Sequence, residues 1–422
     1  MRILNVNDNS VIFEDNSLIL KDCVQNALER GILLLHANLE NADLSNMRMY
    51  GANLTGATLS GADLSRTRLA RANLTNANLD NANLHAANLE NAHLEGATLK
   101  KAALTHANFT KAELLRSNLD NATVSQSIFR HAHLDGASLQ TIHMERSDFS
   151  QAVLTNAKFH GAVIRDSKFS KANLEAAKFH HCQLIFANFD NANMKGADFR
   201  NCEILNSWLT ESNLENATFM NSLIDHSSFN DSYMKRVTFH NVKIENTHMI
   251  SAGIIYCNFT NSVESEPLAA AMSDDVRNGI LTGFMPSAIL NNVNLTHARV
   301  NRTNMERVQV DRLTLDKALL QRVILKEAVL SNVRGEDTFF NECDLSDCEM
   351  KDVHLIEAEF VNGNLREANM LDRVSMDDTL FQNCDMRGAR FDVGNFDSPE
   401  FRNCEYTDTE IMNTESEEGT ED

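Results

Sequence analysis

The sequence predicts an all-β solenoid, and three observations lead to this fold class. The chain has 422 residues but only three prolines and 6% aromatic residues, so a conventional core rich in large rings is not expected. Quintets such as HANLE, NADLS and GANLT follow one another from residue 36 to about residue 260 without a change of register. In most quintets a large apolar residue stands two positions after a small one. A period of five fits neither an α-helix nor a simple strand, but it fits one side of a square coil.

Each quintet is expected to turn its small and its large residue toward the interior of a 20-residue coil. The first block, residues 36–261, holds 45 consecutive quintets, whose central residues run from Leu39 to Phe259. The residue two positions before each centre is mostly Ala. The small residue allows the backbone to turn close to the axis, and the large one fills the middle. Successive coils then stack at the strand spacing of about 4.8 Å.

A second block of quintets is expected over residues 288–413. Its first 17 central residues run from Leu290 to Met370, and Gly335 stands at a centre that should be large, which predicts a local void. After Met370 the centres shift by one position. One extra residue between Leu371 and Arg373 is therefore expected to bulge from a corner, as β-bulges do at sheet edges.

Three segments depart from the repeat. Residues 1–35 contain ILNV, SVIF and SLIL, which predict short strands, and KDCVQNALERG, which predicts a helix ended by Gly31. They are expected to form a small α/β cap, because the end of a solenoid exposes an unpaired edge. Residues 262–287 interrupt the two blocks, have room for a short helix after Pro267, and suggest a functional loop or a hinge. Residues 414–422 are expected to be a disordered acidic tail.

The quintets HANLE, NADLS, RANLT and KANLE follow the pattern A(D/N)LXX, and by this pattern the chain resembles the pentapeptide-repeat family. The resemblance implies a right-handed quadrilateral β-helix. It also points to the members that imitate DNA and bind bacterial DNA gyrase or topoisomerase IV, including the quinolone-resistance proteins, which share a rod, an acidic balance and an interrupting loop. This chain differs from them in its greater length, in its charge gathered at one end, and in an acidic tail where they have an apolar dimerisation helix.

The net charge of −21 is concentrated near the end of the sequence. Residues 336–422 carry 25 acidic and 6 basic side chains, whereas the preceding residues sum to −2. Without the tail, residues 336–403 still carry −11 over about 16 Å of coil. Duplex DNA of that length carries about 10 charges. Two explanations stay open at this point: an acidic surface that keeps the protein in solution, or an imitation of nucleic acid.

Twelve residues are the candidates for contacts with a partner. They comprise acidic residues of the second block, two acidic residues of the interrupting segment, and two aromatic residues that precede central positions and should point outward. They are Glu336, Asp337, Asp344, Asp347, Glu349, Asp352, Glu357, Glu359, Asp274, Asp275, Trp208 and Tyr233.

No catalytic residue, metal ligand or cofactor-binding residue is predicted. Seven of the eight cysteines fall at inward small positions and are expected to pack in the core, while Cys23 lies in the cap helix. Most histidines, including His180 and His181, fall at outward corners. A filled coil offers no interior pocket in which a base and an orienting partner can meet, and no phosphate-loop, dinucleotide or nucleophile-elbow motif is present.

Two hypotheses of function follow. In the first, the acidic end occupies the groove of a bacterial DNA-binding enzyme, such as a type II topoisomerase or a defence nuclease, without direct nucleic-acid or membrane binding. In the second, the chain is a structural or adaptor rod that binds a protein through residues 262–287 and its exposed aromatics. A homodimer is compatible with either. The first residues lack the basic region and long apolar stretch of a signal peptide, so a cytoplasmic location is expected.

Overall fold

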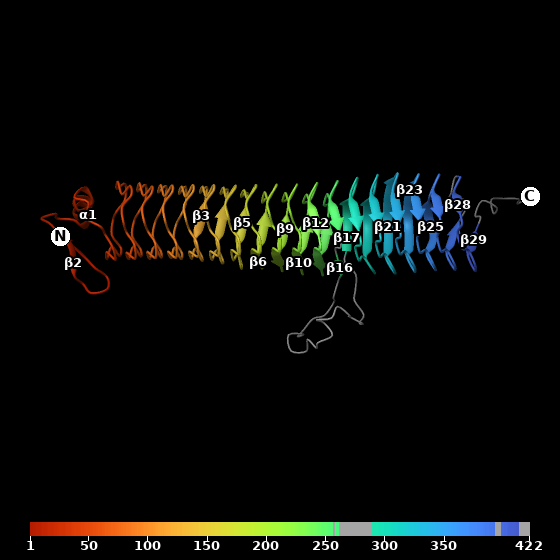
Figure 1. Cartoon of the computed structure of the whole chain (residues 1–422), viewed down its shortest axis with the longest axis horizontal. Helices are drawn as coiled ribbons and strands as arrows, with labels where there is room; N and C mark the ends of the chain where they lie inside the picture. Colours follow the sequence, from red (N-terminus) through yellow and green to blue (C-terminus); the bar gives the residue numbers. More distant parts are fainter. Residues whose placement is uncertain (256–257, 261–288, 393–397, 413–422) are drawn as a thin grey trace, which may run out of the picture. The chain divides into compact units, whose positions relative to one another are not determined.

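The computed structural model describes residues 1–255, 258–260, 289–392 and 398–412. The chain forms two compact units, Met1–Ala217 and Thr218–Asp422, which are described in turn. The interruption at 262–287, with Asp274 and Asp275, and the tail at 414–422 lie outside the described residues. The parallel coils of both units confirm the predicted all-β solenoid, and a small cap begins the first unit (Figure 1).

The cap of the first unit contains two strands and one helix. Strands β1 (Arg2–Leu4) and β2 (Val11–Glu14) pair antiparallel, and helix α1 (Leu20–Glu29) ends just before Gly31, whose φ is +71°. The prediction of a strand at SLIL, residues 17–20, is wrong, because helix α1 begins at Leu20. Asp15 fixes the turn that precedes the helix. The Ser17 hydroxyl and the Asn26 side-chain amide both donate to the Asp15 carboxylate, at 2.8 and 2.7 Å.

The cap closes the edge of the first coil. The backbone N–H of Asn38 donates to the carbonyl of Leu4, and the N–H of Val6 donates to the carbonyl of His36, both at 2.8 Å. The cap backbone thus takes up part of the edge that would otherwise be unpaired.

The coils of the first unit stack with a regular offset of 20 residues. Most pairings are single parallel bridges, such as Asn53 with Asn73, and the remainder are three-residue strands. One parallel sheet contains β3 (Thr123–Ser125), β4 (His143–Glu145), β5 (Val163–Arg165), β7 (Gln183–Ile185) and β9 (Glu203–Leu205), and β6 (Lys178–His180) pairs with β8 (Asp198–Arg200).

Every fifth residue forms a corner of the coil. These residues have φ near +55°, and they are mostly Asn, Gly or long polar residues. The Asn or Asp before a centre caps the turn that follows it: Asp63 Oδ1 accepts the backbone N–H of Ser65, and Asn73 Oδ1 that of Thr75, both at 3.0 Å. The Asn and Asp residues before the centres therefore accept a backbone N–H of the turn, as side chains do in Asx turns.

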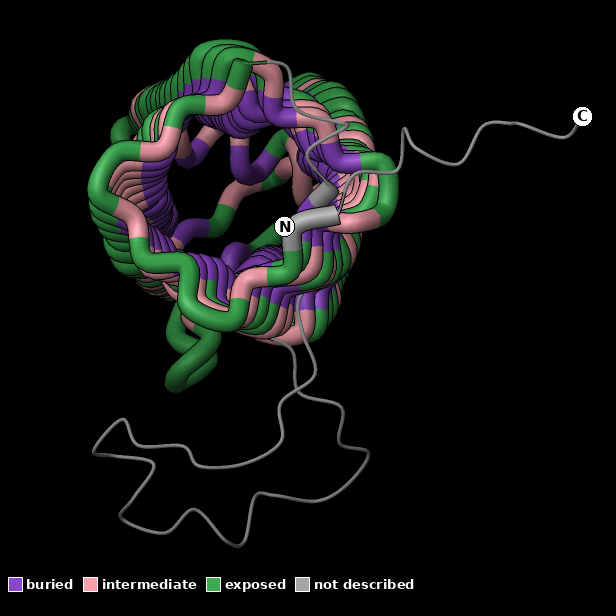
Figure 2. The backbone as a smooth tube through the Cα atoms, turned by 90° about the vertical axis from the view of Figure 1, so that its right-hand side faces the viewer, coloured by how far each residue is buried: buried purple, intermediate pink, exposed green. Residues whose placement is uncertain are grey.

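The interior of the first unit is filled by the two inward positions of each quintet. The small and large residues are buried along the inner side of the coils (Figure 2). Phenylalanines at one centre position stack in a column with ring centroids 4.4–5.2 Å apart: Phe109, Phe129, Phe149, Phe169 and Phe189. Although only 6% of the residues are aromatic, this column places large rings in the core.

The second unit is a coil of the same kind and contains strands of three parallel sheets. The first contains β10 (Thr218–Met220), β13 (Thr238–His240) and β16 (Asn258–Thr260). The second contains β11 (Leu223–Asp225), β14 (Lys243–Glu245), β17 (Ile289–Asn294), β19 (Gln309–Thr314), β21 (Val329–Glu336), β23 (Glu349–Ile356), β25 (Asn369–Ser375), β27 (Arg390–Asp392) and β29 (Glu410–Met412). The third contains β12 (Tyr233–Lys235), β15 (Gly253–Ile255), β18 (Arg299–Asn301), β20 (Leu319–Gln321), β22 (Phe339–Asn341), β24 (Glu359–Val361), β26 (Leu380–Gln382) and β28 (Glu400–Arg402).

Strands β17, β19, β21, β23 and β25 are longer than the others because parallel pairing continues on both sides of one corner, whose residues keep φ between +52° and +61°. At this corner the inward small position is occupied by Val293, Leu313, Val333, Val353 and Val374, all buried. Bulky and β-branched residues are common at paired strand positions, which agrees with the longer pairing here.

The space beside Gly335, where a void was predicted, is filled, and a small cavity lies close to it instead. A Cβ atom at Gly335 would lie 2.4 Å from Thr338 Oγ1 and 3.1 Å from Leu355 Cδ2, so neighbouring side chains already fill that space. A cavity of about 30 Å³ lies nearby, lined by apolar side chains that include Leu313 and Val333. A cavity with no polar partner for water is expected to stay dry.

The one-residue shift after Met370 lies inside β25. Glu349 pairs with Asn369, but Lys351 pairs with Asp372, so the extra residue falls between the centre and the corner residue Arg373. The bulge predicted between Leu371 and Arg373 is therefore present, within the strand. Among the described residues, no helix is long and apolar enough to cross a membrane.

Candidate functional site

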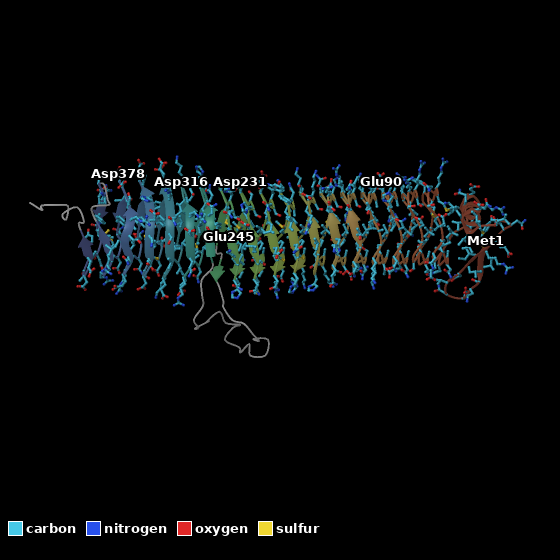
Figure 3. The ribbon with its side chains drawn as sticks, turned by 180° about the vertical axis from the view of Figure 1, so that it is seen from behind. Met1, Glu90, Asp231, Glu245, Asp316 and Asp378 are labelled. Carbon is cyan, nitrogen blue, oxygen red and sulfur yellow. The ribbon has the colours of Figure 1, made fainter. Side chains whose placement is uncertain are left out.

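Acidic side chains gather along one corner of the second unit. The corner residues Lys317, Asp337, Glu357 and Asp378 succeed one another in four stacked coils, each with φ between +51° and +55°. The residues just before them add further carboxylates. The acidic edge is defined here as Asp316, Glu336, Asp337, Glu357, Asp377 and Asp378, and Figure 3 labels Asp316 and Asp378 upon it.

Backbone hydrogen bonds hold the acidic edge in line. The N–H of Lys317 donates to the carbonyl of Glu336 at 2.7 Å, and the N–H of Glu357 donates to that of Asp377 at 2.9 Å. Asp316 Oδ1 also accepts the N–H of Glu336 at 3.0 Å. The spacing of the charges is consequently set by the coil and does not depend on flexible side chains alone.

Little positive charge opposes this line. Lys317 Nζ lies 3.8 Å from Asp337 Oδ2, whereas the exposed carboxylates of Glu336, Glu357 and Asp378 form no ion pair within the described part of the chain. Four coils span about 14 Å, over which a single DNA strand carries about four phosphates. Six carboxylates and one lysine therefore give this edge a charge density similar to that of a DNA strand.

Some acidic residues elsewhere on the second unit are paired with neighbouring arginines. Arg322 donates to Glu342, and this hydrogen bond lowers the pKa of the Glu342 carboxyl. Arg387 likewise lowers the pKa of Asp385. These two carboxylates therefore contribute less unopposed charge than Glu336, Glu357 and Asp378 of the acidic edge.

The structure brings only three of the predicted acidic candidates together. Glu336, Asp337 and Glu357 lie on the acidic edge, but the other five are distributed over other sides and corners of the coil. Asp344 binds the side-chain amide of Asn364, Asp347 occupies another corner, Glu349 begins β23, Asp352 pairs with His354, and Glu359 begins β24.

Sequence reasoning missed Asp316, Asp377 and Asp378. The signal that would have found them is the 20-residue offset combined with the shift after Met370, since 316, 336 and 377 then fall in one column.

The two aromatic candidates point outward, as predicted. Trp208 of the first unit is 44% exposed and Tyr233 of the second is 42% exposed. Phe186, also at an outward corner, is exposed as well.

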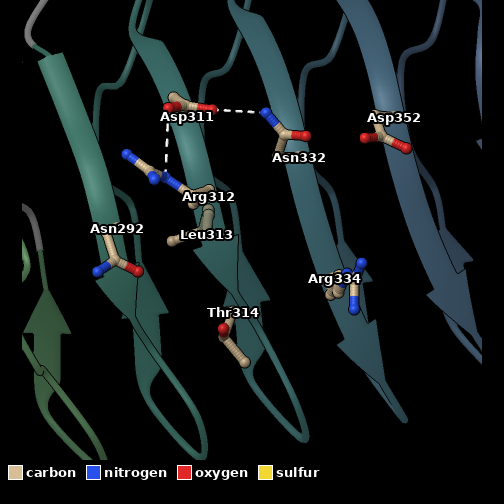
Figure 4. A pocket seen from close by; sticks show the side chains of 8 residues that line it. All are labelled: Asn292, Asp311, Arg312, Leu313, Thr314, Asn332, Arg334 and Asp352. Carbon is tan, nitrogen blue, oxygen red and sulfur yellow. Dashed lines mark hydrogen bonds and ion pairs between the residues drawn. The ribbon is translucent and has the colours of Figure 1, made fainter.

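A shallow groove of about 490 Å³ lies on the extended strands of the second unit (Figure 4). Its walls carry charges of both signs, including Asp311 and Arg312. Asn332 donates to Asp311 at 2.6 Å, and Arg312 donates to the side-chain oxygen of Asn291 at 2.8 Å. Arg334 and Asp352 complete the wall. The sequence did not predict this groove; the bulky residues at the inward small position of the same corner were its only signal.

The described residues contain no group of three or more His, Cys, Asp or Glu side chains placed to hold a metal ion. His160 and His181 have ring centroids 5.2 Å apart on the first unit. The thiols of Cys343 and Cys348 are buried, and burial raises their pKa to about 11 and about 12, which favours the unreactive protonated form.

The chain belongs to the pentapeptide-repeat family. A model of the pentapeptide repeat region matches residues 33–109 and 172–249, and a model of eight pentapeptide repeats matches residues 132–170 and 336–370, which together make up more than half of the chain. No curated protein sequence matches the chain significantly.

The chain is also similar to several solved structures. HetL, a pentapeptide repeat protein involved in the regulation of heterocyst differentiation in the cyanobacterium Nostoc sp., is 21% identical over 71% of this chain and 96% of its own, with a TM-score of 0.24. QnrB1, a plasmid-mediated fluoroquinolone resistance protein, is 17% identical over 44% of this chain and 81% of its own, with a TM-score of 0.27. A pentapeptide repeat protein of the Arabidopsis thaliana thylakoid lumen is 22% identical over 33% of this chain and 66% of its own, with a TM-score of 0.15.

Proposed function

We propose that this protein is a non-catalytic DNA mimic, whose acidic edge occupies the DNA-binding groove of a bacterial DNA-processing enzyme. The enzyme class is a type II topoisomerase or a defence nuclease, in the cytoplasm of a bacterial or phage-infected cell. The observation that supports this proposal is the line of six carboxylates along the acidic edge, of which Glu336, Glu357 and Asp378 are exposed and form no ion pair within the described residues.

Electrostatics gives the mechanism of binding. A basic groove attracts a line of negative charges at long range and raises the association rate, and the attraction falls as salt is added. Because the coils fix the spacing of the carboxylates, little conformational entropy is lost when the groove closes on them.

The test compares two variants of equal net charge. The edge variant replaces Glu336, Asp337, Glu357 and Asp378 by Lys. The control variant replaces Asp347, Glu349, Asp352 and Glu359 by Lys, which adds the same charge at other positions of the unit.

Purified gyrase, topoisomerase IV and a restriction nuclease are each loaded with a labelled duplex, and the protein is added as competitor at several salt concentrations. The unmodified protein and the control variant are expected to displace the duplex from at least one enzyme, less well as salt rises, and the edge variant is expected to fail. Equal competition by the two variants, or no displacement by the unmodified protein, would refute the proposal.

The second candidate function is an adaptor that binds a protein through exposed aromatics. Trp208 and Tyr233 favour it, because such rings are common interface anchors. The predicted contribution of residues 262–287 lies outside the described residues. A partner captured by the unmodified protein at high as well as low salt, and lost on Trp208→Ala or Tyr233→Ala, would support this function over mimicry.

A further inference from the structure

Four arginines gather on one side of the first two coils of the first unit. Arg48 lies on this side in the first coil, and Arg66, Arg68 and Arg71 lie on it in the second. Arg66 and Arg71 are its two corners, with φ of +57° and +59°. These four residues and Tyr50 are named the arginine patch, and all five are exposed.

The arginine patch lacks the ion pairs that arginines form elsewhere on this unit. Arg130 pairs with Asp148 and Arg200 with Asp198. No salt bridge joins Arg48, Arg66, Arg68 or Arg71 to an acidic residue in the part of the chain that the structure describes.

The placement of these arginines does not help the fold. Arg48 and Arg68 are direct partners in a parallel bridge, so two like charges stand one coil apart, which is unfavourable. The buried residues Met47, Met49 and Leu69 between them already fill the interior. Four unpaired guanidinium groups on a unit of nearly balanced charge therefore indicate an anionic ligand.

The aromatic member of the patch narrows the class of ligand. Tyr50 is 62% exposed, and the guanidinium carbon of Arg71 lies 5.8 Å from its ring centre. Beside it, the position of a Cβ on Gly51 has no heavy atom within 4 Å, so there is open space next to the ring. Basic side chains combined with an exposed aromatic ring are typical of single-strand binding, where the bases stack on the ring.

We propose that the arginine patch binds single-stranded nucleic acid, with the guanidinium groups on phosphates and Tyr50 against a base. An acidic polypeptide offers the anions but no flat base, so the exposed ring favours nucleic acid. This activity belongs to the first unit and does not depend on the acidic edge. It also revises the expectation of no direct nucleic-acid binding.

Binding is measured by fluorescence anisotropy, with the full chain and a labelled oligothymidylate of about 12 nucleotides, over about 0.05 to 0.2 M salt. Neutralising three or four phosphates predicts a slope of log K against log salt of about −2 to −3. The variant with Arg48→Glu and Arg68→Glu is expected to lose at least about tenfold in affinity and to show a shallower slope.

Matched variants separate the patch from general charge. Arg130→Glu with Arg200→Glu changes the charge of the same unit equally and is expected to keep the affinity much closer to that of the unmodified protein. Glu90→Gln, which removes the carboxylate one coil beyond the patch, is expected to tighten binding. Tyr50→Ala is expected to weaken binding about 5- to 150-fold without changing the salt slope.

Three results would overturn the proposal: no binding by the unmodified protein at the lowest salt, equal losses in the patch and control pairs, or a polyglutamate peptide that competes as well as unlabelled oligothymidylate. The last would assign the patch to an acidic protein partner. Because the edge variant leaves the patch intact, its oligonucleotide binding reports on this proposal separately from the competition with topoisomerases and nucleases.

Discussion

The phenylalanine column of the first unit allows the contribution of a single ring stack to be measured. Phe129 is stacked on both sides, with centroids 4.6 Å from Phe109 and 4.4 Å from Phe149. Phe109 is stacked on one side only, since Leu89 occupies the same position of the preceding coil. Both rings are fully buried. Leucine is common at the centres of the quintets, so Phe→Leu fits either site.

Phe129→Leu and Phe109→Leu lose similar buried area, but the first removes two ring contacts and the second removes one. A stacked pair contributes about 0.5–1.5 kcal/mol beyond its buried area. Phe129→Leu is therefore expected to reduce the free energy of unfolding by about 1 kcal/mol more than Phe109→Leu, which corresponds to about 2–4 °C in Tm for a unit of this size.

The measurement is thermal and urea unfolding of the full chain, followed by far-ultraviolet circular dichroism. A double variant provides the control, because the two substitutions share one contact and their effects should sum to more than the effect of both together. Equal destabilisation by the two single variants would show that the stacking of rings adds nothing to burial, and the reasoning would fail.

Three further predictions concern other parts of the chain. Gly335→Ala should destabilise the second unit by about 1–3 kcal/mol, because the added methyl meets Thr338 and Leu355, and a rise in Tm would contradict this. Hydrogen bonds from Asn26 and Ser17 hold the pKa of Asp15 well below its usual range, so this carboxylate stabilises the cap above about pH 4 and less as pH falls. Asp15→Asn should accordingly lower Tm at about pH 7, and lower it by less at about pH 2. A disulfide reagent should label half-buried Cys404 before denaturant exposes the other described thiols; early labelling of those thiols would argue against their burial.

Much of the fold was predictable because the repeat constrains every fifth residue in the same way. The inward pair, the corners and the stacking of coils all follow from one quintet, and 45 repetitions leave no competing register. The bulge after Met370 was predictable for the same reason, because a single extra residue shifts every later centre.

The predictions that failed or were incomplete concern departures from the repeat. The SLIL segment has strand-like residues, but side-chain hydrogen bonds to Asp15 turn the chain before Leu20 begins a helix. The prediction of a void at Gly335 did not consider that leucines of the adjacent coils can occupy the empty space.

The candidate site was only partly predictable because a charge count along the sequence does not say which side of the coil each charge occupies. Residues 344, 349 and 359 are as acidic as those of the edge, yet they lie on other sides. The arginine patch escaped notice because its segment is nearly neutral when counted with the rest of the first block. In a coil of this type, charge has to be counted by column, at an offset of 20 residues.

The direction of the backbone hydrogen bonds has a mechanical consequence. Within each unit these bonds connect one coil to the next, as between Leu54 N–H and the Asn73 carbonyl at 2.7 Å, so they lie along the direction in which the coils stack. A force applied in that direction loads the bonds of one coil before those of the next. Pulled from its ends, a unit should therefore peel open at low force in steps that each release about 66–72 Å of chain from 20 residues.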